Sequence, residues 1–317
     1  MALFSEYAVT PDVFNESCYD SPALCDVHFK QLLEVFLSEG LVRNLRNGEW
    51  QAFFSTHARP WHDRTKHILK NLIDAGRLVP SDPASSHTPQ TDREWCNEAL
   101  ESHETTPLNG IIVSDAIRST YRRNQLVESV SRLSQSTCAW WEPTNSSLRL
   151  ERTISQYIDA LKLILKHAKS IMFIDPNIDP AKSNYANFIQ LLEAAGNRPS
   201  QSPRPLVEIH RKSVRGSGKN APLWDQQDME NTFRNEFGPE LSQSNLKAEV
   251  FIWDDFHDRY LISNLGGILV PYGFDTSSKP DDLTTWSRLG RSDRDDVQRE
   301  FARESNKHKL LFNFTVP

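Results

Sequence analysis

The second half of the chain alternates between two hydrophobic periods. Over residues 153–170, apolar side chains recur at helical spacing, which predicts an amphipathic helix. The apolar run 171–174 follows directly and predicts a buried strand, and residues 206–210 predict another. Two more helical patterns cover residues 185–195 and 225–241. Helices and strands therefore alternate here, as they do in layered α/β domains.

Three short strand patterns come next, over residues 248–253, 256–263 and 267–272. A charged helix is expected over residues 293–304, and a last strand over residues 309–316. Because hairpin-connected strands follow strands joined through helices, we expect residues 151–317 to form an α/β domain with a mixed sheet.

The first 150 residues carry mainly helical patterns. We expect helices over residues 21–39, 60–75, 91–102 and 115–133, and one short strand over residues 110–114. Residues 81–91 have the Ser, Pro and His content of a solvated connector, and residues 138–147 indicate a linker or a packed loop. The sequence thus predicts a helix-rich N-terminal domain, residues 1–150, which we expect to recognise a partner protein or a substrate.

Composition narrows the class of protein. An aromatic content of 10% in 317 residues argues against general disorder, and a net charge of −6 argues against capture of nucleic acid by the charge of the whole chain. The four cysteines form no Cys-x-x-Cys pair, which favours reduced thiols over a zinc site. The first residues lack the pattern of a signal peptide, and no apolar run approaches ~18 residues. We expect a soluble, cytoplasmic protein.

Candidate chemistry gathers around the strand pattern 256–263. His257 and Arg259 share one face of that strand, because side chains alternate with a period of two. Asn264 opens the next turn, and Asp275 ends the Gly-Phe-Asp segment that closes the hairpin. An imidazole, a guanidinium and polar groups at one strand end supply a nucleophile or acid and donors for phosphate oxygens. These four are our candidate catalytic residues.

The same residues resemble the motif of the phospholipase D-like superfamily, which is His-x-Lys, four residues, Asp, and then a Gly-x-Asn turn. His257-Asp258-Arg259 stands for His-x-Lys, Asn264 falls at the Asp, and the Gly-Phe-Asp of residues 273–275 lies near the Gly-x-Asn. The Asp-Pro-Asn of residues 175–177 looks like the Asp-Pro-Tyr that often follows the first strand of these domains. The residues of these motifs are more similar still to those of the compact branch typified by the C-terminal domain of MIT-domain proteins.

The resemblance covers about residues 153–317. It implies metal-independent phosphodiester cleavage, in which one His attacks phosphorus, another protonates the leaving oxygen, and cations bind the non-bridging oxygens. It also implies a second His-x-Lys motif from another half or subunit, so we expect a homodimer with two His257 side chains facing across its axis. For the compact branch it implies a phosphate or lipid-headgroup pocket without catalysis. Arg259 can replace Lys, since a guanidinium binds phosphate bidentately, whereas Asn264 lacks the carboxylate that could orient an imidazole.

A basic segment surrounds the strand pattern 206–210. It contains a second His-x-Lys, and its cations and histidine are Arg204, His210, Arg211, Lys212, Arg215 and Lys219. The segment follows the carboxyl end of a strand, the rim at which ligands bind in open α/β sheets. It is either a contact for a phosphate backbone or a solvated surface loop.

Carboxylates offer weaker candidates for a metal site. Asp175 and Asp179 flank a strand end, but Pro176 and Pro180 favour a rigid turn instead. Asp12, Glu34 and Asp115 could form the carboxylate cluster of a PIN-type nuclease, although their spacing gives no support. We expect neither a metal nor another cofactor.

Together these patterns predict a phosphodiesterase that cleaves nucleic acid, with DNA favoured. His257 would act as nucleophile or acid, Arg259 would bind the phosphate oxygens, Asn264 would orient polar groups, and the basic segment would grip the backbone. A role in bacterial defence is only an association with where such modules occur. The alternative is a non-catalytic module that binds a phosphate-bearing ligand, a lipid headgroup or a partner protein. A third reading is a subunit that only binds other proteins.

Overall fold

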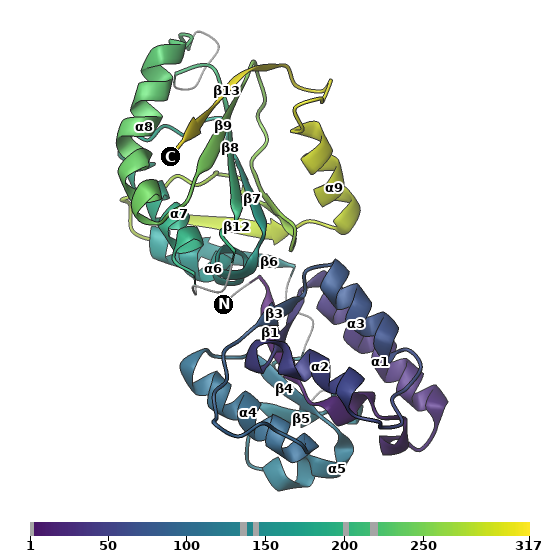
Figure 1. Ribbon diagram of the computed structural model, residues 1–317. Coiled ribbons are helices and arrows are strands. Elements are labelled where there is room, and N and C mark those ends of the chain that lie inside the picture. Colours follow the sequence, from purple (N-terminus) through teal and green to yellow (C-terminus); the bar gives the residue numbers. More distant parts are fainter. Residues whose placement is uncertain (1–2, 134–137, 142–145, 199–202, 216–220) are drawn as a thin grey trace. The chain divides into compact units, whose positions relative to one another are not determined.

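The computed structural model describes residues 3–133, 138–141, 146–198, 203–215 and 221–317 (Figure 1). The chain divides into two compact units, Phe4–Thr144 and, in the main, Asn145–Pro317. Each unit holds helices against its own sheet, which confirms the α/β class. No helix among the described residues combines the length and apolar character needed to cross a lipid bilayer.

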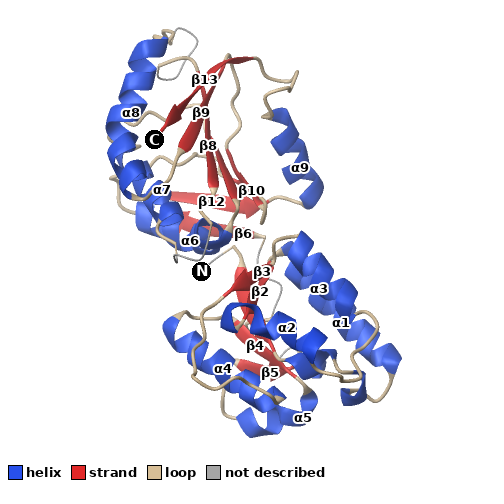
Figure 2. Cartoon of the chain, viewed as in Figure 1, coloured by secondary structure: helices blue, strands red, loops and turns tan. Residues whose placement is uncertain are grey.

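The N-terminal unit is built on five parallel strands, in the order β3-β2-β1-β4-β5 (Figure 2). Their bounds are Ser5–Val9 for β1, Gly40–Asn44 for β2, Leu78–Pro80 for β3, Gly110–Val113 for β4 and Val127–Ser129 for β5. Only β4 was predicted, so the expectation of a helix-rich domain with one strand is wrong. The strand order reverses between β1 and β4, which is the arrangement of a doubly wound sheet.

Helices cover both sides of this parallel sheet (Figure 1). One side carries α1 (Pro22–Ser38), α2 (Glu49–Thr56) and α3 (Thr65–Asp74), and the other carries α4 (Asp92–Thr105) and the short α5 (Asp115–Arg118). The predictions of α1, α3 and α4 are confirmed within a few residues. The long helix expected over residues 115–133 is wrong. An Asx turn, in which Asn124 accepts from the Leu126 amide at 2.9 Å, leads into β5 instead.

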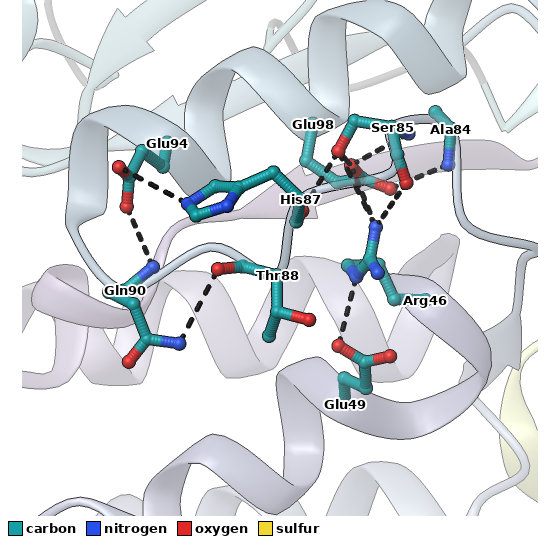
Figure 3. Close-up of polar contacts among 9 residues, drawn as sticks. All are labelled: Arg46, Glu49, Ala84, Ser85, His87, Thr88, Gln90, Glu94 and Glu98. Carbon is teal, nitrogen blue, oxygen red and sulfur yellow. Dashed lines mark hydrogen bonds and ion pairs between the residues drawn. The ribbon is translucent and has the colours of Figure 1, made fainter.

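The connector that the sequence marked as solvated is tied to α4 (Figure 3). The Glu98 carboxylate is fully buried and accepts from the amides of Ala84 and Ser85 at 2.7 and 3.1 Å and from the Ser85 hydroxyl. Arg46 lies 3.4 Å from the same carboxylate and also pairs with Glu49 at 2.9 Å. These hydrogen bonds to a buried carboxylate hold the connector against α4.

Residues 138–141 form a packed loop. The ring of Trp140 lies against Gly110, where an added Cβ would come within 2.2 Å of it. The rings of Trp140 and Trp141 also lie 5.9 and 5.2 Å from that of Tyr7 on β1. Packing is confirmed for residues 138–141, whereas residues 142–145 of the expected segment lie outside the described residues.

The C-terminal unit contains an eight-stranded mixed sheet, in the order β13-β9-β8-β7-β10-β11-β12-β6. Strands β7 (Ser170–Ile174), β8 (Leu206–Lys212) and β9 (Ala248–Trp253) are parallel to one another. The antiparallel remainder consists of β6 (Ser147–Glu151), β10 (Tyr260–Ser263), β11 (Gly267–Leu269), β12 (Leu283–Arg288) and β13 (Leu310–Val316). The mixed sheet is confirmed, although β6 and β12 were not foreseen.

Three helices lie on one side of this sheet and one on the other (Figures 1 and 2). The first group is α6 (Ile154–His167), α7 (Ile189–Gly196) and α8 (Gln226–Gln243), and the fourth helix is α9 (Arg291–Glu300). Buried apolar side chains of α6, including Tyr157 and Leu161, face the sheet as the helical period predicted. The segments that form the candidate functional site lie at one edge of this sheet.

Candidate functional site

The carboxyl ends of the parallel strands and the start of β10 meet at one edge of the C-terminal sheet. Ile174 pairs with His210 in parallel register, and Tyr260 pairs with Ile174 in antiparallel register. The residues that follow β7 and those that precede β10 therefore come together, and Asp175 lies beside Arg259. Ligands in α/β sheets commonly bind at such an edge.

An open recess of about 410 Å³ lies at this edge. Its polar lining carries two cations and two amides, and it is formed by Asn177, Lys182, Asn184, Tyr185, Arg259, Pro271, Tyr272 and Asp275. These residues come from the segment after β7, the start of β10 and the turn after β11. Three stretches distant in the chain thus form one polar cavity.

A buried carboxylate holds the recess together. Asp175 has no exposed surface, and it accepts from the Asn177 amide at 2.9 Å, the Tyr185 hydroxyl at 2.9 Å and the Phe274 amide at 3.1 Å. Burial raises the pKa of this carboxyl, whereas the three donors and the charge of Arg259 oppose the rise. Burial, followed by the charge of Asp175, also raises the pKa of the Tyr185 hydroxyl, so Tyr185 remains a donor.

The Gly-Phe-Asp segment approaches this carboxylate with its backbone. Gly273 has a φ of +74°, and a Cβ added there would lie 2.0 Å from Oδ2 of Asp175. Only glycine meets both requirements, because it adopts positive φ freely and has no side chain to clash. The glycine of the motif therefore allows the Phe274 amide to reach Asp175.

Arg259 is fixed on one side and open on the other. Its Nε lies 3.5 Å from Oδ1 of Asp175, and its Nη1 donates to the carbonyls of His257 and Pro271 at 3.4 and 3.3 Å. The side chain is still 28% exposed, and no described residue makes a hydrogen bond or ion pair with Nη2. A guanidinium held in this way presents donors to an anion without losing much side-chain entropy on binding.

Asp275 lines the recess, and its carboxylate is paired with a cation. Its Oδ2 accepts from Arg152 at 2.7 Å and from Asn184 at 3.4 Å. Arg152 also pairs with Asp282 at 3.0 Å and places its guanidinium 4.8 Å from the centre of the Tyr272 ring. Asp275 therefore anchors the wall of the site through Arg152.

Two candidate catalytic residues lie elsewhere. Strand β10 begins at Tyr260, so His257 lies in the preceding loop, not on a strand face beside Arg259. The His257 ring is 79% exposed, lies 3.7 Å from Asp255 and does not line the recess. Asn264 follows the opposite end of β10, where its Oδ1 accepts from the amides of Lys169 and Ser170 at 2.7 and 3.4 Å. Its expected place beside Arg259 is wrong, because the whole of β10 separates the two.

Three residues of the basic segment, His210, Arg211 and Lys212, are buried, which contradicts their expected role as surface contacts. His210 has no exposed surface, stacks 4.7 Å from Phe251 and accepts a hydrogen bond from Trp253 at 3.1 Å. Arg211 is 1% exposed, and burial lowers its pKa to about 10, with Asp179 as the main opposing charge. Lys212 is 9% exposed.

Of the other members of this segment, Arg204 and Arg215 are exposed, and Lys219 lies outside the described residues. His210, Arg211 and Lys212 were misread because they end strand β8, whose place in the sheet the sequence does not show. Strand β8 is central in the sheet, so side chains on both faces are covered.

The carboxylate pairs do not gather into a metal site in the part of the chain that the structure describes. Asp179 pairs weakly with Lys182 at 3.9 Å. In the N-terminal unit, Asp12 pairs with Arg59 at 2.6 Å, and its amide donates to Asp92 at 2.8 Å. Glu34 lines a different groove, on α1.

Sequence reasoning missed four lining residues of the recess, Lys182, Asn184, Tyr185 and Tyr272. It also missed Arg152, which supports the lining through Asp275 and Tyr272. The one local signal was the Asp-Pro-Asn that follows β7, since the polar residues after it are those most able to reach the same edge. Arg152 had no such signal, because it lies 123 positions from its partner Asp275.

Comparisons with known proteins add little to this description. No protein-family model matches the sequence, and no curated protein matches it. Among solved structures, a similar chain comes from "Structure of TrmBL2, an archaeal chromatin protein, shows a novel mode of DNA binding". It is 11% identical, covers 82% of this chain and 87% of its own, and has a TM-score of 0.30. A TM-score this low identifies neither a fold nor a function.

Proposed function

We propose that the C-terminal unit binds a phosphate-bearing ligand in the recess at the edge of its eight-stranded sheet. The observation that carries the proposal is the guanidinium of Arg259, which the buried Asp175 holds in place while its outer face lines the recess. Lys182, which is 40% exposed and lies 3.9 Å from Asp179, adds a second cation to the lining. Such a pair suits the oxygens of one phosphate group.

The remaining lining supports an anionic ligand. Asn177 and Asn184 offer amide donors, and the carboxylate of Asp275 is already paired with Arg152. The likeness of residues 153–317 to the compact branch of the phospholipase D-like superfamily points the same way, because that branch suggests a phosphate pocket without catalysis. In this reading the unit recognises a ligand and does not turn it over.

Phosphodiester hydrolysis is the second candidate. It is favoured by one observation: the His257 ring is exposed, and the backbone carbonyl of the same residue accepts a hydrogen bond from Nη1 of Arg259. One imidazole per chain supplies either the nucleophile or the acid, so the reaction would require a homodimer that brings two His257 side chains to one phosphate. Nucleic acid, with DNA favoured, is the substrate that we propose for this candidate.

Binding tests the first candidate. Isothermal titration with ribose 5-phosphate should show saturable binding to the full chain. Arg259→Ala and Lys182→Ala should each weaken it at least about tenfold, the loss typical of a charge-assisted hydrogen bond. The matched controls are Arg204→Ala and Lys162→Ala, which remove exposed cations outside the recess. Equal loss in the controls, or no binding at all, would contradict the proposal.

Cleavage tests the second candidate. The chain is incubated with single-stranded DNA and with plasmid in EDTA, and its oligomeric state is measured in the same buffer. Hydrolysis that disappears in His257→Ala, in a chain that is dimeric, would establish the phosphodiesterase. Binding that survives His257→Ala, together with intact DNA, would leave the ligand-binding module.

A further inference from the structure

The lip of the recess carries an exposed aromatic ring. Tyr272 lines the cavity, yet 56% of its surface is exposed. It lies between Pro271, whose carbonyl accepts from Arg259, and Gly273, whose amide donates to the Val270 carbonyl at 2.7 Å. The ring is therefore attached to the same rigid turn that positions the cation.

Arg152 supports one face of this ring. Its guanidinium lies 4.8 Å from the ring centre and is itself held by Asp275 at 2.7 Å and Asp282 at 3.0 Å. The Arg152 side chain is only 14% exposed, so this support is part of the protein interior. A ring packed on one face and exposed elsewhere has its second face available to a planar ligand.

The size of the recess also exceeds the needs of a bare phosphate. Its volume of about 410 Å³ falls within the range of ~300–1,000 Å³ usual for sites that bind small organic ligands. Arg259 and Lys182 form one part of the lining, and the ring of Tyr272, which contacts Arg152, forms another part. Stacking of a base on such a ring is favourable for every base, because each has a flat π-face.

Resting on the proposed function, we infer that the ligand of the recess is a nucleotide, either free or at the end of a strand. Its phosphate contacts Arg259 and Lys182, and its base stacks on the open face of Tyr272. Tyr272 is then the residue that separates nucleotides from other phosphate esters, while Arg152 keeps its ring in place.

The test compares ligands that share a phosphate and differ in the base. The full chain is titrated with AMP, ribose 5-phosphate, adenosine and inositol 1-phosphate. We expect AMP to bind about 10- to 100-fold more tightly than ribose 5-phosphate, the gain typical of one stacked base. The adenine H2 and H8 protons of bound AMP should shift upfield in NMR spectra, as they do above an aromatic ring.

Variants of the ring identify the cause. Tyr272→Phe should keep the preference for AMP, whereas Tyr272→Ala and Tyr272→Leu should remove it and leave the affinity for ribose 5-phosphate unchanged. Equal affinity of the parent chain for AMP and ribose 5-phosphate would overturn the inference, as would tighter binding of inositol 1-phosphate. Failure of the proposed function looks different, because then no phosphate ester binds and Arg259→Ala has no effect.

Discussion

Gly273 holds a backbone conformation that other residues rarely adopt. With a φ of +74° and the Asp175 carboxylate 2.0 Å from an added Cβ, Gly273→Ala should cost about 1–3 kcal/mol of stability. The displaced turn should also abolish binding in the recess, since Tyr272 and the Phe274 amide move with it. Urea unfolding and titration measure both effects.

The matched control for that substitution is Gly238→Ala on α8. No atom lies within 4 Å of the Cβ added there, so its stability should change by less than about 1 kcal/mol. Equal effects of the two substitutions would show that the contact with Asp175 has no part in the loss.

A buried imidazole makes the C-terminal unit sensitive to acid. Burial lowers the pKa of His210, and Glu208 opposes this only in part. Its Nδ1 accepts from Trp253, so protonation there would break that hydrogen bond. Because the unfolded chain binds this proton more readily, stability should be complete above about pH 6.5 and fall as the pH drops below it.

Urea unfolding at pH 7.5 and 5.5 measures this dependence. His210→Phe, which keeps a ring between the aromatic neighbours, should reduce the loss on acidification by about 1 kcal/mol. His257→Ala removes an exposed ring, so its stability should depend on pH in the same way as that of the parent chain. A parent chain with equal stability at both pH values would contradict the role of His210.

At the scale of elements, Glu98 holds the segment 81–90 against α4 through the amides of Ala84 and Ser85. Glu98→Ala would leave the amides of Ala84 and Ser85 and the buried Arg46 without this acceptor, at a cost of about 2 kcal/mol. Limited proteolysis should then cut this segment faster, and the urea midpoint should fall. Glu101→Ala, an exposed site on the same helix, should change neither.

Elements with strong local patterns were predictable, and those stabilised by distant partners were not. The long helix α6 and the buried strand β7 follow from apolar spacing alone. Strands β1 and β2 were missed because each buries a charge, and Arg43 pairs with Glu6 at 2.6 Å inside the unit. A charged residue within a strand pattern usually indicates a position exposed to solvent. Only the neighbouring strand shows that the charge belongs to a buried ion pair.

At the scale of the whole molecule, charge limits how the protein can bind nucleic acid. The net charge is −6, and the cations of the recess are Arg259 and Lys182. If a single strand binds through these two contacts, the slope of log K against log salt should be about −1.4. Fluorescence anisotropy with a short labelled oligonucleotide measures this slope.

The double variant Arg204→Ala, Arg215→Ala tests the alternative that the basic segment contributes. It should leave the slope unchanged, because these exposed residues do not line the recess. A slope steeper than about −3 in the parent chain that becomes shallow in the variant would restore the basic segment as a backbone contact.

The sequence by itself determined the α/β class of the C-terminal half and drew attention to Arg259, Asp175 and Asp275. These conclusions depend on periods of two and 3.6 residues and on short polar runs at strand ends, which are local properties of the chain. Tertiary structure alone decided which side chains share the recess. Lys182 and Tyr272 line it, and His257 and Asn264 do not, because strand order and the start of β10 set their positions. Such long-range placement follows from how strands pair, and no local pattern records it.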